Sequence, residues 1–375
     1  MKAETNSHEI NDPSLSIPEE NINSPRFEWL DQFRGMCVIL YIIGIMSWGL
    51  SGEIVDGILP VGSTFYNHGW AISFKLFDQS PFDFPSIITI IDLGQPNLIF
   101  LVGFMQAYSF KRRENRFSKK SAWIHVFNRF GLLLATSVLF EDILLSHGLF
   151  TALFAGTFAS LAWASLFGGV SAAYIRKADN RVMIGLIIMT IHAILYAIPG
   201  LNSFEFGFEH QIFYIPWKMI NLSAISIVAS GYSIYFLGQG EKFEPENILF
   251  RSRILPLCLI MFGANYLIDF LQWADNPHCT TSLAFLTIAI SSLGMFVFYE
   301  FSRYDFKIPF FSAFGKNMWI MFIISPVLEW ILIALIKDVV MASRWMALLL
   351  AGIFPLVLMG FIAKVLEKKK ILVKL

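Results

Sequence analysis

The stretch Ser86–Phe110, SIITIIDLGQPNLIFLVGFMQAYSF, is long and apolar enough to cross ~30 Å of hydrocarbon as a helix. Lys111, Arg112 and Arg113 follow it directly. Basic residues at one end of an apolar helix indicate the cytoplasmic side of a membrane. The stretch therefore predicts a membrane helix whose carboxyl end lies inside the cell, and the rest of the chain repeats this pattern.

Ten such apolar stretches run through the 375 residues. Their predicted ranges are 33–51, 86–110, 122–145, 149–175, 182–200, 212–238, 254–272, 278–299, 310–336 and 345–366. Hydrophobic residues make up 56% of the chain and the mean hydropathy is +0.61, more than a soluble domain of this length would bury. The predicted fold class is all-α, a polytopic transmembrane helical bundle of about ten spans.

The distribution of positive charge predicts the orientation of these spans. If the amino terminus is cytoplasmic, 22 of the 28 Lys and Arg residues fall in inside segments, three in outside loops and three within spans. The positive-inside rule then places both termini in the cytoplasm. Residues 1–25 are polar and read as a disordered cytoplasmic tail, and 26–375 form the membrane domain. We expect a multi-pass protein of the plasma or inner membrane.

The overall charge balance bears on partners. The chain holds 28 basic and 28 acidic residues, so no net charge favours nucleic acid as a partner. Membrane lipid is an expected partner, and a homodimer is left open. The three cysteines predict no disulfide framework.

One predicted span carries a regular row of small residues. They recur at every fourth position, which makes one narrow stripe on a helix, and they are Ala152, Gly156, Ser160, Ala164, Gly168 and Ala172. Such a stripe lets a neighbouring backbone approach closely, so we predict helix packing here. The alternative is a lining for a flat ligand.

Polar residues within the spans are a second signal. Each costs ~2.5 kcal/mol or more at mid-bilayer unless it is paired or hydrated. They recur at helical spacing on five spans, which predicts one shared wet cavity, although structural hydrogen bonds between helices would give the same pattern. The predicted substrate or cavity residues are Asp31, Gln95, Lys218, Asn265, Asp269, Lys316 and Asn317.

Histidine is the usual general base at neutral pH, and four of the seven histidines fall in or beside outside segments. These are His68, His147, His210 and His278, whereas His192 lies in the middle of a span. No pair has the spacing of metal ligands, so no metal is predicted.

Three elements of the sequence resemble the heparan-α-glucosaminide N-acetyltransferase family of membrane acyltransferases. Leu30–Gly35 (LDQFRG) is similar to its LDxFRG signature, and Asp92–Gly103 (DLGQPNLIFLVG) to its DLxxPxFxFxxG segment. Phe314–Met318 (FGKNM) resembles its FGxNAL element, and Thr280–Leu283 is similar to the start of the preceding helix. The resemblance covers roughly residues 26–120 and 265–335.

The resemblance implies a reaction in which an acetyl group moves from cytoplasmic acetyl-CoA to a sugar or glycan on the far side of the membrane. It implies that His68, in the loop after the first span, is the base or acetyl carrier. Asp92 would orient the imidazole or the acceptor. Because CoA carries phosphates, its nucleotide end needs cationic partners, and Arg34, His125 and Arg129 lie on the inner side for this role.

Other classes of function remain open from the sequence. A transporter or flippase would use the polar stripes and the prolines within spans equally well, although we find no inverted repeat. A non-catalytic partner in glycan assembly is a third alternative. The expected activity is an acyl-CoA-dependent acetyltransferase, with acetyl-CoA as the donor substrate.

Overall fold

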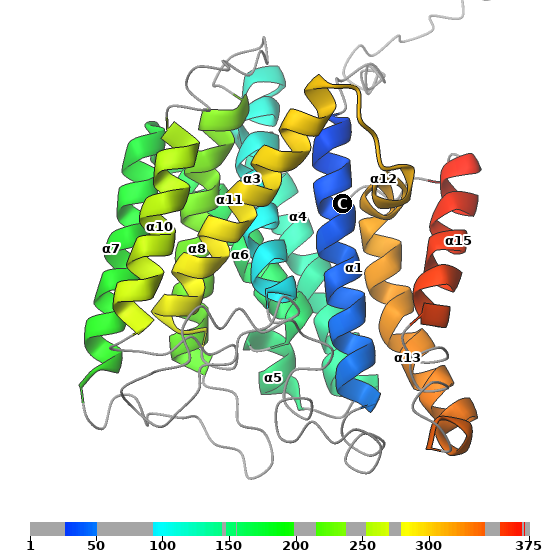
Figure 1. Ribbon diagram of the computed structural model, residues 1–375. Helices are drawn as coiled ribbons and strands as arrows, with labels where there is room; N and C mark the ends of the chain where they lie inside the picture. The colour runs from blue at the N-terminus through cyan, green and yellow to red at the C-terminus, as the bar shows by residue number, and fades with distance from the viewer. Residues whose placement is uncertain are drawn as a thin grey trace, which may run out of the picture.

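The computed structural model describes residues 27–50, 93–144, 148–154, 156–198, 215–237, 253–269, 279–341, 353–369 and 371. These residues are helical and contain no strand. The helices lie roughly side by side as a bundle (Figure 1). The all-helical prediction is therefore confirmed for the part of the chain that is described.

The first half of the bundle consists of α1 (Glu28–Leu50), α3 (Gly94–Arg116), α4 (Lys119–Ser137), the π-helix η2 (Val138–Leu144), α5 (Leu149–Phe154) and α6 (Thr157–Tyr174). The second half consists of α7 (Ala178–Tyr196), α8 (Ile215–Leu237), α10 (Leu255–Asp269), α11 (Thr281–Arg303), α12 (Pro309–Lys316), α13 (Met318–Met341) and α15 (Phe354–Lys368). Among the described residues, five helices are long and apolar enough to cross a membrane, or up to six if the bent pair α12 and α13 counts as one span.

The predicted span 310–336 falls on the bent helix pair α12 and α13. The chain bends by 88° between α12 and α13, at Asn317. Asn317 is buried at this bend, where its Nδ2 donates to the carbonyl of Ala313 and so competes with the backbone hydrogen bonds. The apolar run was visible in the sequence, but its break was not.

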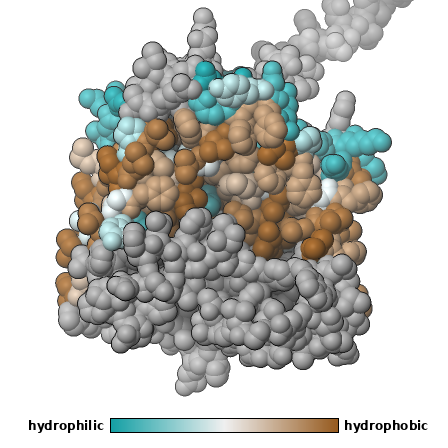
Figure 2. Space-filling model, in the orientation of Figure 1, coloured by the Kyte–Doolittle hydropathy of each residue, from teal (hydrophilic) through white to brown (hydrophobic). Residues whose placement is uncertain are grey.

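The helix ends that carry basic residues come together at one end of the bundle. Trp29, near the start of α1, contacts Phe236 at the end of α8 and Tyr299 near the end of α11, each with ring centroids 5.8 Å apart. In Figure 2, hydrophilic side chains line this end, and apolar side chains cover the surface below it. We call it the basic end, and it corresponds to the side predicted to be cytoplasmic.

Four of the six small residues lie on α6 and are used for helix packing, as predicted, whereas Ala152 lies on α5 and Gly156 precedes α6. A Cβ added at Gly168 on α6 would lie 3.1 Å from the Cα of Gly103 on α3. A Cβ added at Gly103 would lie 2.5 Å from the carbonyl oxygen of Ser226 on α8. The Ser226 hydroxyl also donates to the Ala164 carbonyl of α6 at 2.6 Å. Three backbones meet here because none of them carries a bulky side chain.

Candidate functional site

Two of the motifs singled out in the sequence lie against each other. A Cβ added at Gly35 of the LDQFRG segment would lie 1.8 Å from the carbonyl oxygen of Phe311, and one at Gly315 of the FGKNM segment would lie 1.7 Å from that of Asp31. No side chain fits at either position, so the backbones of α1 and α12 touch. Segments almost 280 residues apart in the sequence thus form one structural unit at the basic end.

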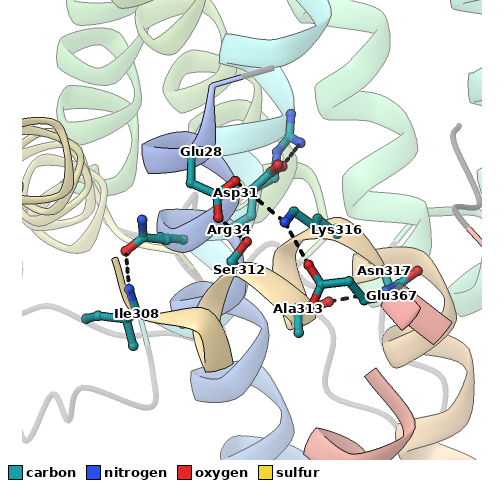
Figure 3. Close-up of polar contacts among 10 residues, drawn as sticks. Glu28, Asp31, Arg34, Ile308, Ser312, Ala313, Lys316, Asn317 and Glu367 are labelled. Carbon is teal, nitrogen blue, oxygen red and sulfur yellow. Dashed lines mark hydrogen bonds and ion pairs between the residues drawn. The ribbon is translucent and has the colours of Figure 1, made fainter. Parts of the chain in front are cut away.

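Charged side chains surround this contact (Figure 3). Lys316, at the end of α12, donates to Glu367 of α15 at 2.7 Å and lies 3.5 Å from Glu28 of α1. On α1, Arg34 donates to the buried carboxylate of Asp31 at 2.9 Å. The predicted cavity residue Lys316 therefore links α1, α12 and α15 through its ion pairs, whereas Asp31 pairs with Arg34 within α1.

Asn317 occupies the break between α12 and α13. Its side chain is fully buried, and its Nδ2 donates to the carbonyl of Ala313 at 3.3 Å. Its Oδ1 finds no hydrogen-bond partner among the described residues. A buried amide oxygen without a donor is costly, so this acceptor is available to a further group such as water or a ligand.

A cationic centre lies between α1, α3, α4 and α6; we define it as Arg34, Arg113, His125, Arg129 and Gln106. Arg129 Nη1 donates to Gln106 Oε1 at 3.2 Å, and the Ser165 hydroxyl donates to the same oxygen at 3.1 Å. Arg34 and Arg129 are close enough for their charges to repel, and His125 lies within the field of Arg113 and Arg129.

Two hydrogen-bond donors of this centre are left over. Arg129 Nε and Gln106 Nε2 are buried and have no partner among the described residues. Arg181, the other arginine deep in the bundle, is different, because it donates to the carbonyls of Ile175, Ser230 and Ala172 at 2.7, 2.9 and 3.3 Å. Arg181 is thus satisfied by the fold, whereas the cationic centre presents unused donors and positive charge.

A second polar group lies towards the opposite end of the bundle and was not predicted as a site from the sequence. His192 of α7, Asn221 of α8 and Thr281 of α11 are fully buried and in mutual contact. We call these three residues the distal polar cluster. The sequence signal was weak, since His192 was a lone histidine in an apolar span and Asn221 a single amide.

In the described part of the chain, the predicted site residues lie towards two different ends of the bundle. The basic end holds Asp31, Arg34, His125, Arg129, Lys316 and Asn317. Lys218 and Asn265 lie towards the opposite end, where Asn265 accepts from the Ser282 hydroxyl at 2.7 Å, and Gln95 lies in the first turn of α3. His68, Asp92 and the side chain of Asp269 lie outside the described residues, as do His147, His210 and His278.

The geometry defines a class of protein, an all-helical bundle with helices of membrane-spanning length and polar clusters in its interior. No protein-family description matches the sequence, and the comparison with curated proteins finds no significant match. The resemblance to membrane acyltransferases therefore stays a prediction carried by its motifs. Among the described residues, no three His, Cys, Asp or Glu side chains come close enough to hold a metal ion.

Proposed function

We propose that this protein is a membrane acyltransferase that takes an acetyl group from acetyl-CoA at the basic end and delivers it to a sugar or glycan on the opposite side. The observation that carries the proposal is the cationic centre, with two buried donors that no described residue uses. Its arginines and His125 are partly buried, and positive charges gathered at a partly buried site are stabilised when an anion or water compensates them. The phosphates of CoA are anions of the required kind.

The contact between the LDQFRG and FGKNM segments supports the same proposal. Both segments resemble motifs of membrane acyltransferases and lie wholly within the described residues. They contact each other beside the cationic centre, to which Arg34 of the first segment belongs. In the proposed reaction, Arg34, His125 and Arg129 hold the nucleotide end of the donor. His68 and Asp92 keep their proposed roles as base or acetyl carrier and as its orienting carboxylate.

The proposed topology has ten spans with both termini in the cytoplasm. It rests on the charge asymmetry of the sequence, and the gathering of basic helix ends at one end of the bundle supports it (Figures 1 and 2). The protein would be a multi-pass component of the cell membrane, with the donor entering from the cytoplasm.

The topology can be tested with two engineered cysteines in a background that lacks the three native ones. We expect a cysteine at Asp78 to react with an impermeant maleimide in intact cells, and a cysteine at Asn115 to react only after the membrane is opened. Asn115 follows the basic run at the end of α3, which the positive-inside rule assigns to the cytoplasm. The reverse labelling pattern would contradict the proposed direction of acetyl transfer.

A transporter or flippase is the second candidate, and one observation favours it. Discontinuous helices are typical of transporter binding sites, and α12 and α13 form such a pair, with an 88° bend. The buried Asn317 Oδ1 at the break is an unused acceptor in the described part of the chain. A transported solute would bind at this break, beside the ion pairs of Lys316.

One experiment separates the two candidates. Purified protein should bind acetyl-CoA with a measurable dissociation constant in isothermal titration calorimetry, and adenosine 3′,5′-bisphosphate should compete because it carries phosphates of CoA without the acyl arm. If the protein is an acyltransferase whose donor site binds the phosphates of CoA, we expect both results. If neither ligand binds while proteoliposomes accumulate or flip a glycolipid, the transporter reading is correct and the acyltransferase proposal fails.

A further inference from the structure

The bundle covers only one side of α4. Together with η2, this helix forms the apolar segment Lys119–Ile143, which is long enough to cross a membrane. Its inner side holds the buried Val126 and Leu133, and also Arg129, which donates to Gln106 of α3. The opposite side is exposed. We call it the outer face of α4, and it consists of Ile124, Phe127, Asn128, Gly131, Leu132 and Ala135.

A single polar side chain, that of Asn128, interrupts the outer face of α4. Asn128 lies nine residues after Lys119, the first residue of α4, which corresponds to ~13 Å along the helix axis. The hydrocarbon layer of a membrane is ~30 Å thick, so the amide lies well inside it when Lys119 stays at the basic end. The amide makes no hydrogen bond to any residue that the structure describes. A polar group at this depth is unfavourable unless it finds a partner.

Two exposed hydroxyl groups show how such a side chain can be satisfied locally. The hydroxyl of Thr136 on α4 donates to the Leu132 carbonyl at 2.9 Å, and that of Thr190 on α7 donates to the Leu186 carbonyl at 2.9 Å. Each threonine thus bonds to its own helix. An asparagine amide also carries an acceptor oxygen, and the interior of a helix has no free N–H group to offer it. Asn128 therefore needs a partner from outside its own helix.

The neighbours of Asn128 leave room for a second helix. Gly131 and Ala135 lie on the same face, about one and two turns further along, and a Cβ added at Gly131 would meet no atom within 4 Å. Small residues four positions apart let another helix backbone approach closely, and the larger Phe127 and Leu132 flank this strip. The outer face thus combines a flat strip with an amide that needs a partner.

We propose that two copies of this protein associate in the membrane through the outer face of α4, with the two Asn128 amides hydrogen-bonded to each other. Two copies with the same orientation are related by a twofold axis along the membrane normal, which places equivalent residues opposite each other at the same depth. Because an amide has both donors and an acceptor, each Asn128 can donate one bond and accept one. The outer face has no charged residue, so the two copies do not repel each other there.

A second copy fits this face better than a different membrane protein does. A helix of another sequence must carry a polar group at the same depth as Asn128, whereas a second copy does so by symmetry. The contact also leaves the cationic centre uncovered, because Arg129 and Gln106 meet on the inner side of α4. Association through α4 is therefore independent of the proposed acetyl transfer.

The first test measures self-association of the purified full-length protein in phosphatidylcholine vesicles. Copies labelled with a donor and an acceptor dye should show energy transfer that falls as the protein is diluted with lipid. Asn128→Leu should raise the dissociation constant about tenfold, the factor for two hydrogen bonds between membrane helices, whereas Asn128→Gln keeps the amide and should stay close to the wild type. Thr190→Leu is the matched control, because it removes an exposed polar group that bonds to its own helix.

Two glycines supply a second matched pair of variants. Gly131→Leu places a large side chain on the strip and should abolish association, whereas Gly263→Leu on α10 should leave it unchanged. An added Cβ meets no atom within 4 Å at either glycine, so both variants should unfold at the thermal midpoint of the wild type. Loss of energy transfer in Gly131→Leu alone is then a loss of association.

Oxidative cross-linking tests the same contact with Asn128 left in place. In a background without the three native cysteines, Ala135→Cys should form a disulfide-linked dimer in vesicles, whereas Leu259→Cys, at an exposed position on α10, should not. A wild type that stays monomeric at every protein-to-lipid ratio would mean that lipid or another protein covers this face, and it overturns the proposal. Equal association of Asn128→Leu and Thr190→Leu, or equal cross-linking of the two cysteines, overturns it as well.

Discussion

Replacing Gly35 with alanine should lower the free energy of unfolding by ~3 kcal/mol or more, the upper part of the range for overpacked cores. The added Cβ would lie 1.8 Å from the Phe311 carbonyl oxygen, which is backbone and cannot rotate away. The helices α1 and α12 would have to separate along their whole contact. Thermal unfolding of the purified protein in detergent, followed by tryptophan fluorescence, should show a large fall in the midpoint.

The bundle supplies a matched control for this substitution. Gly131 on α4 and Gly263 on α10 have no atom within 4 Å of an added Cβ. Alanine at these helical positions should be neutral or should stabilise by up to ~1 kcal/mol, because alanine is the better helix former. A wild-type midpoint for Gly35→Ala, or equal losses at all three glycines, would contradict the close contact of α1 and α12.

Replacing Arg129 with glutamine should weaken acetyl-CoA binding about 10- to 100-fold, which corresponds to the ~1.5–3 kcal/mol of a hydrogen bond to a charged group. The reason is that Arg129 supplies the buried Nε donor and much of the positive charge of the cationic centre. Titration calorimetry with acetyl-CoA measures the change directly. The midpoint of thermal unfolding without ligand should stay near that of the wild type, because glutamine also removes the repulsion with Arg34.

Substitutions at two other arginines serve as controls for Arg129→Gln. Arg303→Gln removes an exposed residue whose partner is Glu300 at 3.0 Å, and it should change neither binding nor stability. Arg181→Gln should reduce stability, because three carbonyl groups lose their donor. If Arg129→Gln behaves like Arg181→Gln, with lower stability and unchanged affinity, Arg129 is a structural residue and the proposed donor site is wrong.

The two polar regions also explain why the sequence suggested one cavity. Stripes of polar residues at helical spacing show which face of each helix is polar. They do not show which residues of different helices lie at the same level along the bundle axis. Lys316 and Lys218 look alike in the sequence, yet Lys316 pairs with Glu367 at the basic end and Lys218 lies towards the opposite end. Only the direction and packing of the helices separate them.

The sequence by itself determined the helical class, the membrane-length apolar segments and the part of the small-residue stripe that lies on α6, from Ser160 to Ala172. These follow from local chemistry, because hydrophobicity and the 3.6-residue period of a helix are properties of neighbouring residues. Positive charge near span ends is a local signal of the same kind, and it supplied the proposed orientation.

The tertiary structure alone decided which distant groups meet. Nothing in the sequence indicated that Gly35 would touch Phe311, that Arg129 would keep an unused donor beside Gln106, or that His192 would reach Thr281. Such contacts depend on the crossing of helices far apart in the chain, and a crossing is set by the fit of whole side-chain surfaces. Sequence spacing records only contacts within one helix, so the two polar sites emerge only when the bundle is assembled.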